Sequence, residues 1–263
     1  MMNRRTGHAI FWAFAWSISG LQGHAAQDAS STVALGHVPL LFVDDTGIAS
    51  HHGVVRTLHA ARTRAEPVLV ADQPWEGQRV YTYGSVLFDP PGRQFRLWYM
   101  SRSQPETGPL PSPGLRDGGT DITLYATSDD GVRWDKPTLG LLPYRESKAN
   151  NLVADLHSPS VLLDRFESDP AKKYKLLGHF HGGYYAAYSP DGIRWEDAPG
   201  NPLFKGDDTM AMTQHPVTGE FMVYFKRAYS VPQGRVVSLT RSRDFKTWSE
   251  PKLVFKADRK SVV

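Results

Sequence analysis

Acidic side chains stand at the ends of several apolar runs in this chain. Asp207 and Asp208 come directly before the run 209–213, Glu76 precedes an earlier run, and Asp45 follows a short apolar segment. Two facing carboxyl groups can do acid–base chemistry when one is protonated and the other is ionised. Each acid also has a structural interpretation. Asp207 and Asp208 would form a solvated loop, Glu76 would be an exposed loop acid, and Asp45 would make an Asx turn.

Aromatic and polar residues beside the same runs suit contacts with a polar ligand. Trp75 offers a ring face for stacking, and Tyr83 and His157 lie at the starts of two runs. Each of the three is equally compatible with a packed structural role. His179 and His181 have the spacing of two metal ligands on a strand, but without a third placed ligand we expect no metal site. The sequence has no glycine-rich phosphate loop or nucleophile elbow, so we expect no cofactor.

A short phrase of the form Ser-x-Asp-x-x-x-Trp occurs at 128–134, 189–195 and 242–248. In the first two copies glycine follows the aspartate. The copies recur every roughly 50–60 residues, which is long enough for one four-stranded sheet. We expect Asp and Gly to form a tight turn between the third and fourth strands, and Trp to pack between neighbouring sheets. The phrase therefore marks the fold and is not a site.

Short β-branched and aromatic runs separated by Pro, Gly and Asp clusters precede each copy of the phrase, which predicts strands joined by turns. The predicted strands are 85–89, 95–100 and 122–127, then 160–164, 174–178 and 183–188, then 209–213, 220–225 and 235–240. Fourth strands are expected near 139–142 and 253–255, and a weak helical pattern covers 54–64. This pattern predicts an all-β protein, a β-propeller of four-stranded antiparallel blades.

The predicted organisation is a signal peptide at 1–25 and a partial propeller at 26–263, with blades near 77–145, 150–205 and 206–256. Propellers usually have at least four blades, so we expect a truncated chain of about three blades plus an N-terminal strand at 40–44. The alternative is a compact fold of three units.

The first residues have the layout of a secretory signal. Arg4 and Arg5 precede the apolar stretch 9–21, and Ala25 ends a small-residue cleavage site. We expect a secreted or periplasmic protein that has no membrane contact after cleavage; a retained anchor is the alternative, although the stretch is shorter than the roughly 20 residues that span a bilayer. The chain has no cysteine and a net charge of +3, which falls close to neutral without the leader. Nucleic acid is therefore not an expected partner, and the oligomeric state stays open.

The repeated phrase, paired with inner strands that end in Asp at 85–89 and 160–164, resembles the five-bladed β-propeller glycoside hydrolases over roughly residues 40–255. This superfamily includes the arabinanases, β-xylosidases, invertases and levansucrases of glycoside hydrolase families 43, 32 and 68. The segments 41–45 and 74–76 are most similar to exported bacterial proteins of the family 32 type. Sialidase-type propellers are a more distant alternative. Their aspartate boxes separate Asp from Gly by one more residue, whereas in this chain Gly directly follows Asp in the first two copies.

The resemblance implies hydrolysis of glycosidic bonds in poly- or oligosaccharides by paired carboxyl groups. It implies catalytic roles for Asp208, Glu76 and Asp45. Sugar-binding roles fall to Trp75, Tyr83, His157 and Asp207. The chain departs from the invertases, because their Trp-Asn-Asp-Pro-Asn and Arg-Asp-Pro motifs are absent and 206–209 reads Gly-Asp-Asp-Thr. A non-catalytic carbohydrate-binding propeller or an inactive relic is therefore the alternative function.

Overall fold

The computed structural model describes residues 48, 50–61, 63–102, 112, 114–229 and 234–256. They all lie within one unit, Phe42–Val263. The predicted signal peptide, the predicted strand 40–44 and the candidate Asp45 lie outside the described residues. No helix in the described part is long and apolar enough to cross a membrane.

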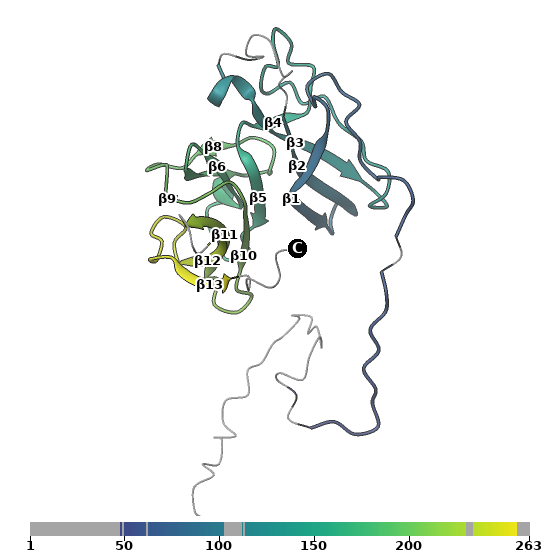
Figure 1. Ribbon diagram of the computed structural model, residues 1–263. Helices are drawn as coiled ribbons and strands as arrows, with labels where there is room; N and C mark the ends of the chain where they lie inside the picture. The colour runs from purple at the N-terminus through teal and green to yellow at the C-terminus, as the bar shows by residue number, and fades with distance from the viewer. Residues whose placement is uncertain are drawn as a thin grey trace, which may run out of the picture. The chain divides into compact units, whose positions relative to one another are not determined.

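Among the described residues, three antiparallel sheets account for nearly all of the regular structure (Figure 1). The first sheet contains β1 (Val80–Asp89), β2 (Gln94–Arg102), β3 (Asp121–Ser128) and β4 (Leu152–Ala154). The second contains β5 (His157–Leu163), β6 (Tyr174–Phe180), β7 (Gly183–Ser189) and β8 (Glu196–Asp197), and β9 (Phe204–Lys205) also pairs with β7. The third contains β10 (Met210–Gln214), β11 (Phe221–Tyr229), β12 (Gly234–Ser242) and β13 (Lys252–Lys256). Two short 3₁₀ turns are η1 (Arg116–Gly119) and η2 (Pro170–Lys172).

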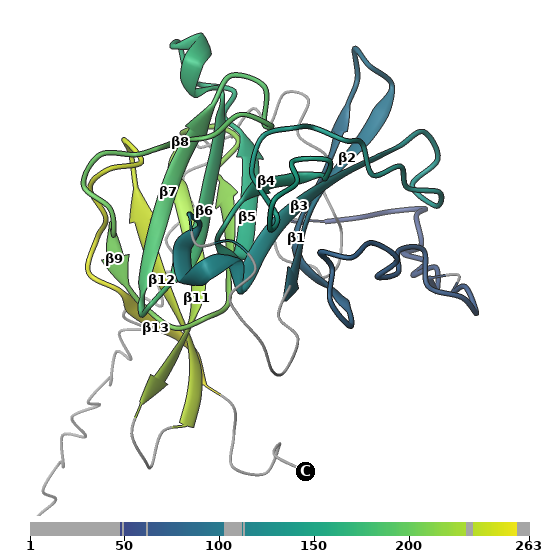
Figure 2. The ribbon, with the colours of Figure 1, turned by 90° about the horizontal axis from the view of Figure 1, so that it is seen from above.

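The sheets follow one another in chain order, and each is a meander of four strands with β9 added to the second (Figure 2). Their first strands lie side by side, because β5 contacts both β1 and β10. Four-stranded antiparallel sheets that share an inner row of first strands are the blades of a β-propeller. The predicted fold class, an all-β protein with the four-stranded antiparallel blades of a β-propeller, is thereby confirmed, and the described residues form three such blades.

The predicted fourth strand at 139–142 is wrong, as is the weak helix at 54–64. The fourth strand of the first sheet is β4, which pairs with β3 after a single bridge between Thr127 and Asp135. The segment 139–142 is apolar because its leucines pack against the sheet's two clusters, not because its backbone joins the ladder. The described residues of 54–64 are exposed and lack regular structure.

The repeated phrase forms the turn that its sequence predicts. In the first copy, the Ser128 hydroxyl accepts a hydrogen bond from the Gly131 N–H at 2.8 Å. The Asp130 carboxylate accepts from the N–H groups of Val132 and Arg133, both at 2.8 Å. The second copy repeats these bonds at corresponding positions. One carboxylate thus satisfies two backbone donors at the end of each third strand.

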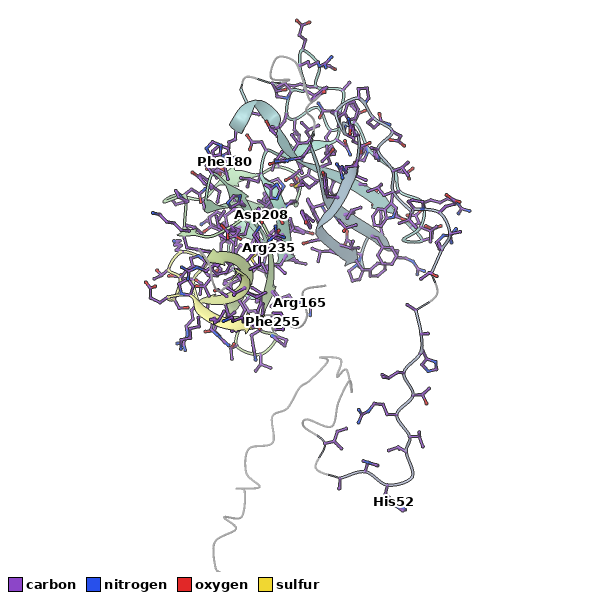
Figure 3. The ribbon with its side chains drawn as sticks, viewed as in Figure 1. His52, Arg165, Phe180, Asp208, Arg235 and Phe255 are labelled. Atoms are coloured by element: carbon purple, nitrogen blue, oxygen red, sulfur yellow. The ribbon has the colours of Figure 1, made fainter. Side chains whose placement is uncertain are left out.

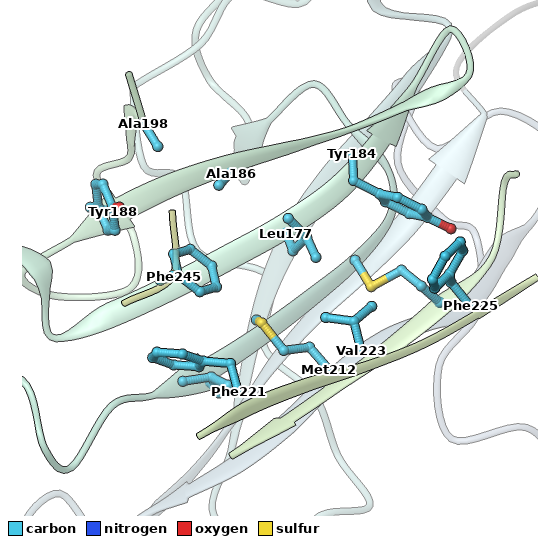
Figure 4. Close-up of a cluster of buried hydrophobic side chains, with 12 residues drawn as sticks. Leu177, Tyr184, Ala186, Tyr188, Ala198, Met212, Phe221, Val223, Phe225 and Phe245 are labelled. Atoms are coloured by element: carbon cyan, nitrogen blue, oxygen red, sulfur yellow. The ribbon is translucent and has the colours of Figure 1, made fainter. Parts of the chain in front are cut away.

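The described core consists of two clusters between sheets and a third on the other face of the first sheet. Side chains of β6 and β7 face Met212, Val223 and Phe225 of the third sheet (Figure 4). Trp248 packs against this cluster, and Trp195 packs against the cluster between the first and second sheets. Both tryptophans therefore occupy the predicted position between sheets. Trp134 instead packs on the opposite face of the first sheet, where the cluster also contains Tyr99 and Leu124.

Candidate functional site

A pocket of about 350 Å³ lies where the first strands of the three sheets begin. The first sheet and its connections contribute two rings from β1 and four charged side chains, the second sheet contributes histidines and Phe180, and the segment before β10 contributes an aspartate. Figure 3 labels Phe180, the last residue of β6, and Asp208, which lies just before β10. The lining residues are Tyr81, Tyr83, Met100, Arg102, Arg116, Asp121, Asp155, His157, His179, Phe180, His181 and Asp208.

Irregularities in two first strands place the lining residues. The pairing of β1 with β2 shifts between Tyr81 and Ser85, and the pairing of β5 with β6 shifts between His157 and Ser160. In β1 the shift includes Gly84, where a Cβ would lie 1.9 Å from the Trp98 carbonyl oxygen. In β5 it includes Ser158, whose φ of 53° is unusual for a residue with a side chain. Bulges of this kind re-aim side chains and are common beside binding sites.

Asp121, the first residue of β3, connects two sheets at the pocket wall. Its carboxylate lies 2.8 Å from Nε of Arg102 and 3.1 Å from Nδ1 of His157. Burial alone would raise the pKa of Asp121, but the hydrogen bonds and charges of His157 and Arg102 outweigh it and lower the pKa. Asp121 is therefore ionised at neutral pH.

The other two lining carboxylates also have cationic partners. Asp155 accepts the backbone N–H of Arg116 at 2.7 Å and forms an ion pair with the same residue's guanidinium. Asp208 forms an ion pair with Lys226. Partial burial would raise the pKa of Asp208, but the hydrogen bond and charge of Lys226 lower it.

His179 is held neutral. Burial, followed by the neighbouring His157, lowers the pKa of His179. Its Nε2 accepts the N–H of Gly182 at 3.1 Å. A neutral imidazole, ionised carboxylates and aromatic ring faces together can bind hydroxyl groups and the apolar faces of a sugar ring.

Three residues proposed from the sequence meet in this pocket: Tyr83, His157 and Asp208. Asp207 adjoins Asp208 but is not among the described lining residues; its backbone N–H donates to the Lys226 carbonyl, and its own carbonyl accepts the Tyr184 hydroxyl. Of the Asp207–Asp208 pair, only Asp208 is among the described lining residues of the pocket.

Glu76 and Trp75 lie on the other face of the first sheet, so the sequence-based interpretation of Glu76 as an exposed loop acid or a pocket acid needs correction. The Glu76 side chain is fully buried. It accepts the Tyr99 hydroxyl at 2.7 Å and lies 2.8 Å from Nζ of Lys136. Trp75 donates its indole N–H to Asn151 at 2.7 Å. These contacts fasten the segment before β1 to the sheet, so we do not assign either residue to the pocket.

The sequence interpretation missed the charged pairs Arg102–Asp121 and Arg116–Asp155 and the ring of Phe180, whereas Tyr81 belongs to the segment 81–84 that the sequence places at the start of the first strand. A signal existed for the first pair. Arg102 ends a strand and Asp121 begins the next, so antiparallel pairing brings them together. Within the described part of the chain, no group of three or more His, Asp or Glu residues is arranged to hold a metal ion.

No protein-family model matches the sequence, and a comparison with curated proteins finds no match. Solved structures do match. An N-acetylgalactosamine deacetylase from F. plautii is 18% identical with a TM-score of 0.46; the match covers 66% of this chain and 53% of that one. A fructofuranosidase from Schwanniomyces occidentalis is 15% identical with a TM-score of 0.46, covering 65% and 33%. An α-L-arabinanase from Cellvibrio cellulosa is 11% identical with a TM-score of 0.47, covering 74% and 68%.

This chain thus spans about half of the deacetylase chain and a third of the fructofuranosidase chain. Propeller-type glycoside hydrolases, which the sequence pattern resembles, are among the structures to which it is similar. Because one fold hosts many reactions, we argue function from the residues of this pocket.

Proposed function

We propose that this protein is glycoside hydrolase-like and binds a poly- or oligosaccharide in the pocket at the first strands. The observation that carries the proposal is the convergence of ring faces and hydroxyl-binding groups from three sheets. Tyr81, Tyr83 and Phe180 offer ring faces, and His157 and Asp208 offer polar groups. Carbohydrate sites combine such rings with a few placed polar groups, because a sugar has apolar C–H faces and a rim of hydroxyls.

In this proposal Asp208 is the ionised catalytic carboxylate. Its lowered pKa suits a nucleophile or a base that activates water. Hydrolysis also needs a protonated acid for the leaving oxygen. Of the described lining carboxylates, Asp121 and Asp208 have lowered pKa values, and Asp155 is bound in an ion pair with Arg116. We therefore assign the acid role to none of them.

The same observation favours a second candidate, a non-catalytic carbohydrate-binding propeller. A binding pocket needs ionised acceptors and ring faces but no proton donor of raised pKa. The two candidates differ in the fate of the bound sugar and not in the site that binds it.

Release of reducing sugar from a broad polysaccharide panel tests the enzyme. We expect Asp208→Asn to lower the rate by about 100-fold or more. The matched control is Asp129→Asn, an exposed aspartate in the first repeated turn. Undiminished activity of Asp208→Asn would exclude the catalytic assignment. Binding without hydrolysis, measured by calorimetry on the same panel, would establish the second candidate, and the absence of both would refute the proposal.

We also propose that residues 1–25 are a cleaved leader and that the protein acts outside the cytoplasm. The basic start, the apolar stretch and the small residues before position 26 support this. N-terminal sequencing of protein recovered from the periplasm or medium should begin at Ala26. Recovery of the intact N-terminus in the cytoplasm would contradict it.

A further inference from the structure

The hairpin that joins β6 to β7 holds an exposed histidine in an unusual backbone conformation beside the pocket. Phe180 pairs with Gly183, so His181 and Gly182 form a two-residue turn. Both turn residues have positive φ, 46° and 79°, as a type I′ turn requires. Asn, Asp or Gly usually fills the first position of this turn, and a positive φ is uncommon for a residue with a side chain. A strained residue at a pocket points to a function of the segment that holds it.

The turn places two stacked rings on the pocket wall. The ring centroids of Phe180 and His181 are 4.2 Å apart, with 15° between the ring planes, and both residues line the pocket. The edge of Tyr185 supports Phe180 at 5.6 Å. The Gly182 N–H donates to Nε2 of His179 at 3.1 Å, which fixes the turn. The rings are therefore held in place before a ligand arrives, which lowers the entropic cost of binding.

A second ring pair lines the same pocket from the first sheet. Tyr81 and Tyr83 of β1 have ring centroids 6.0 Å apart and 24° between their planes. The Arg79 guanidinium lies 5.6 Å from the centroid of the Tyr81 ring, which is half-buried. Tyr83 is 42% exposed, so it offers the more accessible ring of this pair.

The ring contacts between the two pairs run through two histidines. The His157 centroid lies 6.0 Å from that of Tyr83 and 6.1 Å from that of His179, which Phe180 follows in β6. A ligand that covers both Tyr83 and Phe180 must therefore extend across more than one ring width, as two linked sugars do. The volume of about 350 Å³ is near the lower end of the roughly 300–1,000 Å³ of small-molecule sites, so the pocket suits a short segment of a chain.

We propose that the pocket has two sugar subsites, one on the Tyr83 ring and one on the Phe180–His181 pair, and that its ligand is an oligosaccharide segment of at least two units. This inference rests on the proposed carbohydrate function and adds a minimum length of the ligand. Stacking uses the apolar C–H faces that many sugars share. The two subsites therefore select for length and leave the choice of sugar to the polar groups.

The number of subsites that a ligand fills decides which rings matter to it. A monosaccharide fills one subsite, so only one of the variants Tyr83→Leu and Phe180→Leu should weaken its binding. A disaccharide or longer chain fills both, so each variant should lose about tenfold in affinity for it, as for one ring contact. The two losses should add in the double variant, because the rings come from different sheets.

Saturation-transfer NMR and calorimetry on the full chain measure these affinities. The probes are the methyl glycosides, disaccharides and longer chains of arabinose, xylose and fructose, and the same series of any other sugar that binds in the polysaccharide panel. A chain that is hydrolysed is measured in the Asp208→Asn background. Tyr83→Phe keeps the ring and should keep the affinity. The matched controls are Tyr224→Leu and Phe255→Leu, because these rings are 39% and 63% exposed and are not among the described lining residues.

The dependence on length in the wild type needs no variant. Affinity should rise by about tenfold or more from the methyl glycoside to the disaccharide, and binding of the disaccharide alone would also support two subsites. Equal affinity for one unit and two, or equal losses in both variants with the methyl glycoside, would overturn the two subsites while leaving the carbohydrate function intact. Failure of every sugar to bind would refute the proposed function and this inference with it.

Discussion

The indole N–H of Trp98 donates a 2.6 Å hydrogen bond to the carbonyl oxygen of Gly192, joining the first sheet to the repeated turn of the second. Arg96 reinforces the junction, since its guanidinium donates to the hydroxyls of Tyr125 and Tyr174, both at 2.7 Å, and to the Asp191 carbonyl. The second copy of the repeated phrase therefore does more than turn the chain. Its backbone carbonyls accept hydrogen bonds from side chains of the first sheet.

Gly192→Ala should destabilise the protein by about 2 kcal/mol or more. Gly192 has a φ of 74°, and a Cβ would lie 2.8 Å from the Trp98 ring. Gly140→Ala is the matched control, because Gly140 has a similar φ of 71° and open space around it. Urea unfolding of the two variants separates the cost of the steric contact with Trp98, which only Gly192→Ala has, from the cost of the positive φ, which both variants share. Equal losses would show that the junction tolerates a methyl group.

Gly84→Ala should destabilise the protein by about 3 kcal/mol or more and also weaken ligand binding. The new Cβ would meet the Trp98 carbonyl oxygen at 1.9 Å, so the bulge in β1 would have to move and shift Tyr83 with it. Gly114→Ala is the control, because a Cβ there meets no atom within 4 Å. Equilibrium unfolding measures the first effect and calorimetry the second. A stable Gly84→Ala protein with full affinity would contradict this role of the bulge.

Lys136→Met should cost about 3–5 kcal/mol in the free energy of unfolding, because it leaves a buried carboxylate without its charge partner. Glu76 is fully buried and the Lys136 side chain is 8% exposed. Adding Glu76→Gln should recover part of the loss, which a double-mutant cycle in urea measures. Lys148→Met, at an exposed site, is the control.

The same pair separates a structural role of Glu76 from a catalytic one. If Glu76 only anchors the segment before β1, hydrolysis or sugar binding per folded molecule should be unchanged in Glu76→Gln. A large loss of activity in the folded variant would restore the catalytic interpretation.

Asp244 should make the stability of the third sheet's turn depend on acid pH. Burial opposes its charge, but the N–H groups of Thr247 and Lys246 outweigh this and lower the pKa of Asp244 from 3.8 to about 2. A carboxyl group whose pKa is lower in the folded state stabilises the fold at pH values above the pKa that it has in the unfolded chain. This stabilisation is lost as the pH falls from about 4 to 2. Because the side chain is exposed, we expect about 1 kcal/mol.

The comparison of wild type with Asp244→Asn across this range measures the effect. The difference in unfolding free energy should be present at pH 6 and disappear towards pH 2. A difference that stays constant down to pH 2 would show that charge is not its cause.

Local sequence determined the blades of this protein. The strands alternate with turn residues, and each Ser-x-Asp phrase makes its own hydrogen bonds within a few residues. Such short-range chemistry can be predicted without knowing the rest of the chain. The prediction of a fourth strand at 139–142 was wrong because an apolar segment can pack against a sheet without forming a strand of it.

Only the tertiary structure decided which acids are buried and which face the pocket. Glu76 precedes an apolar run, as Asp208 does, yet it pairs with Lys136, far along the chain, on the opposite face of the first sheet. Asp121 and His157 become partners through the contact between two sheets. The environment of a carboxyl group depends on neighbours that are distant in sequence, and those neighbours meet only when the sheets pack.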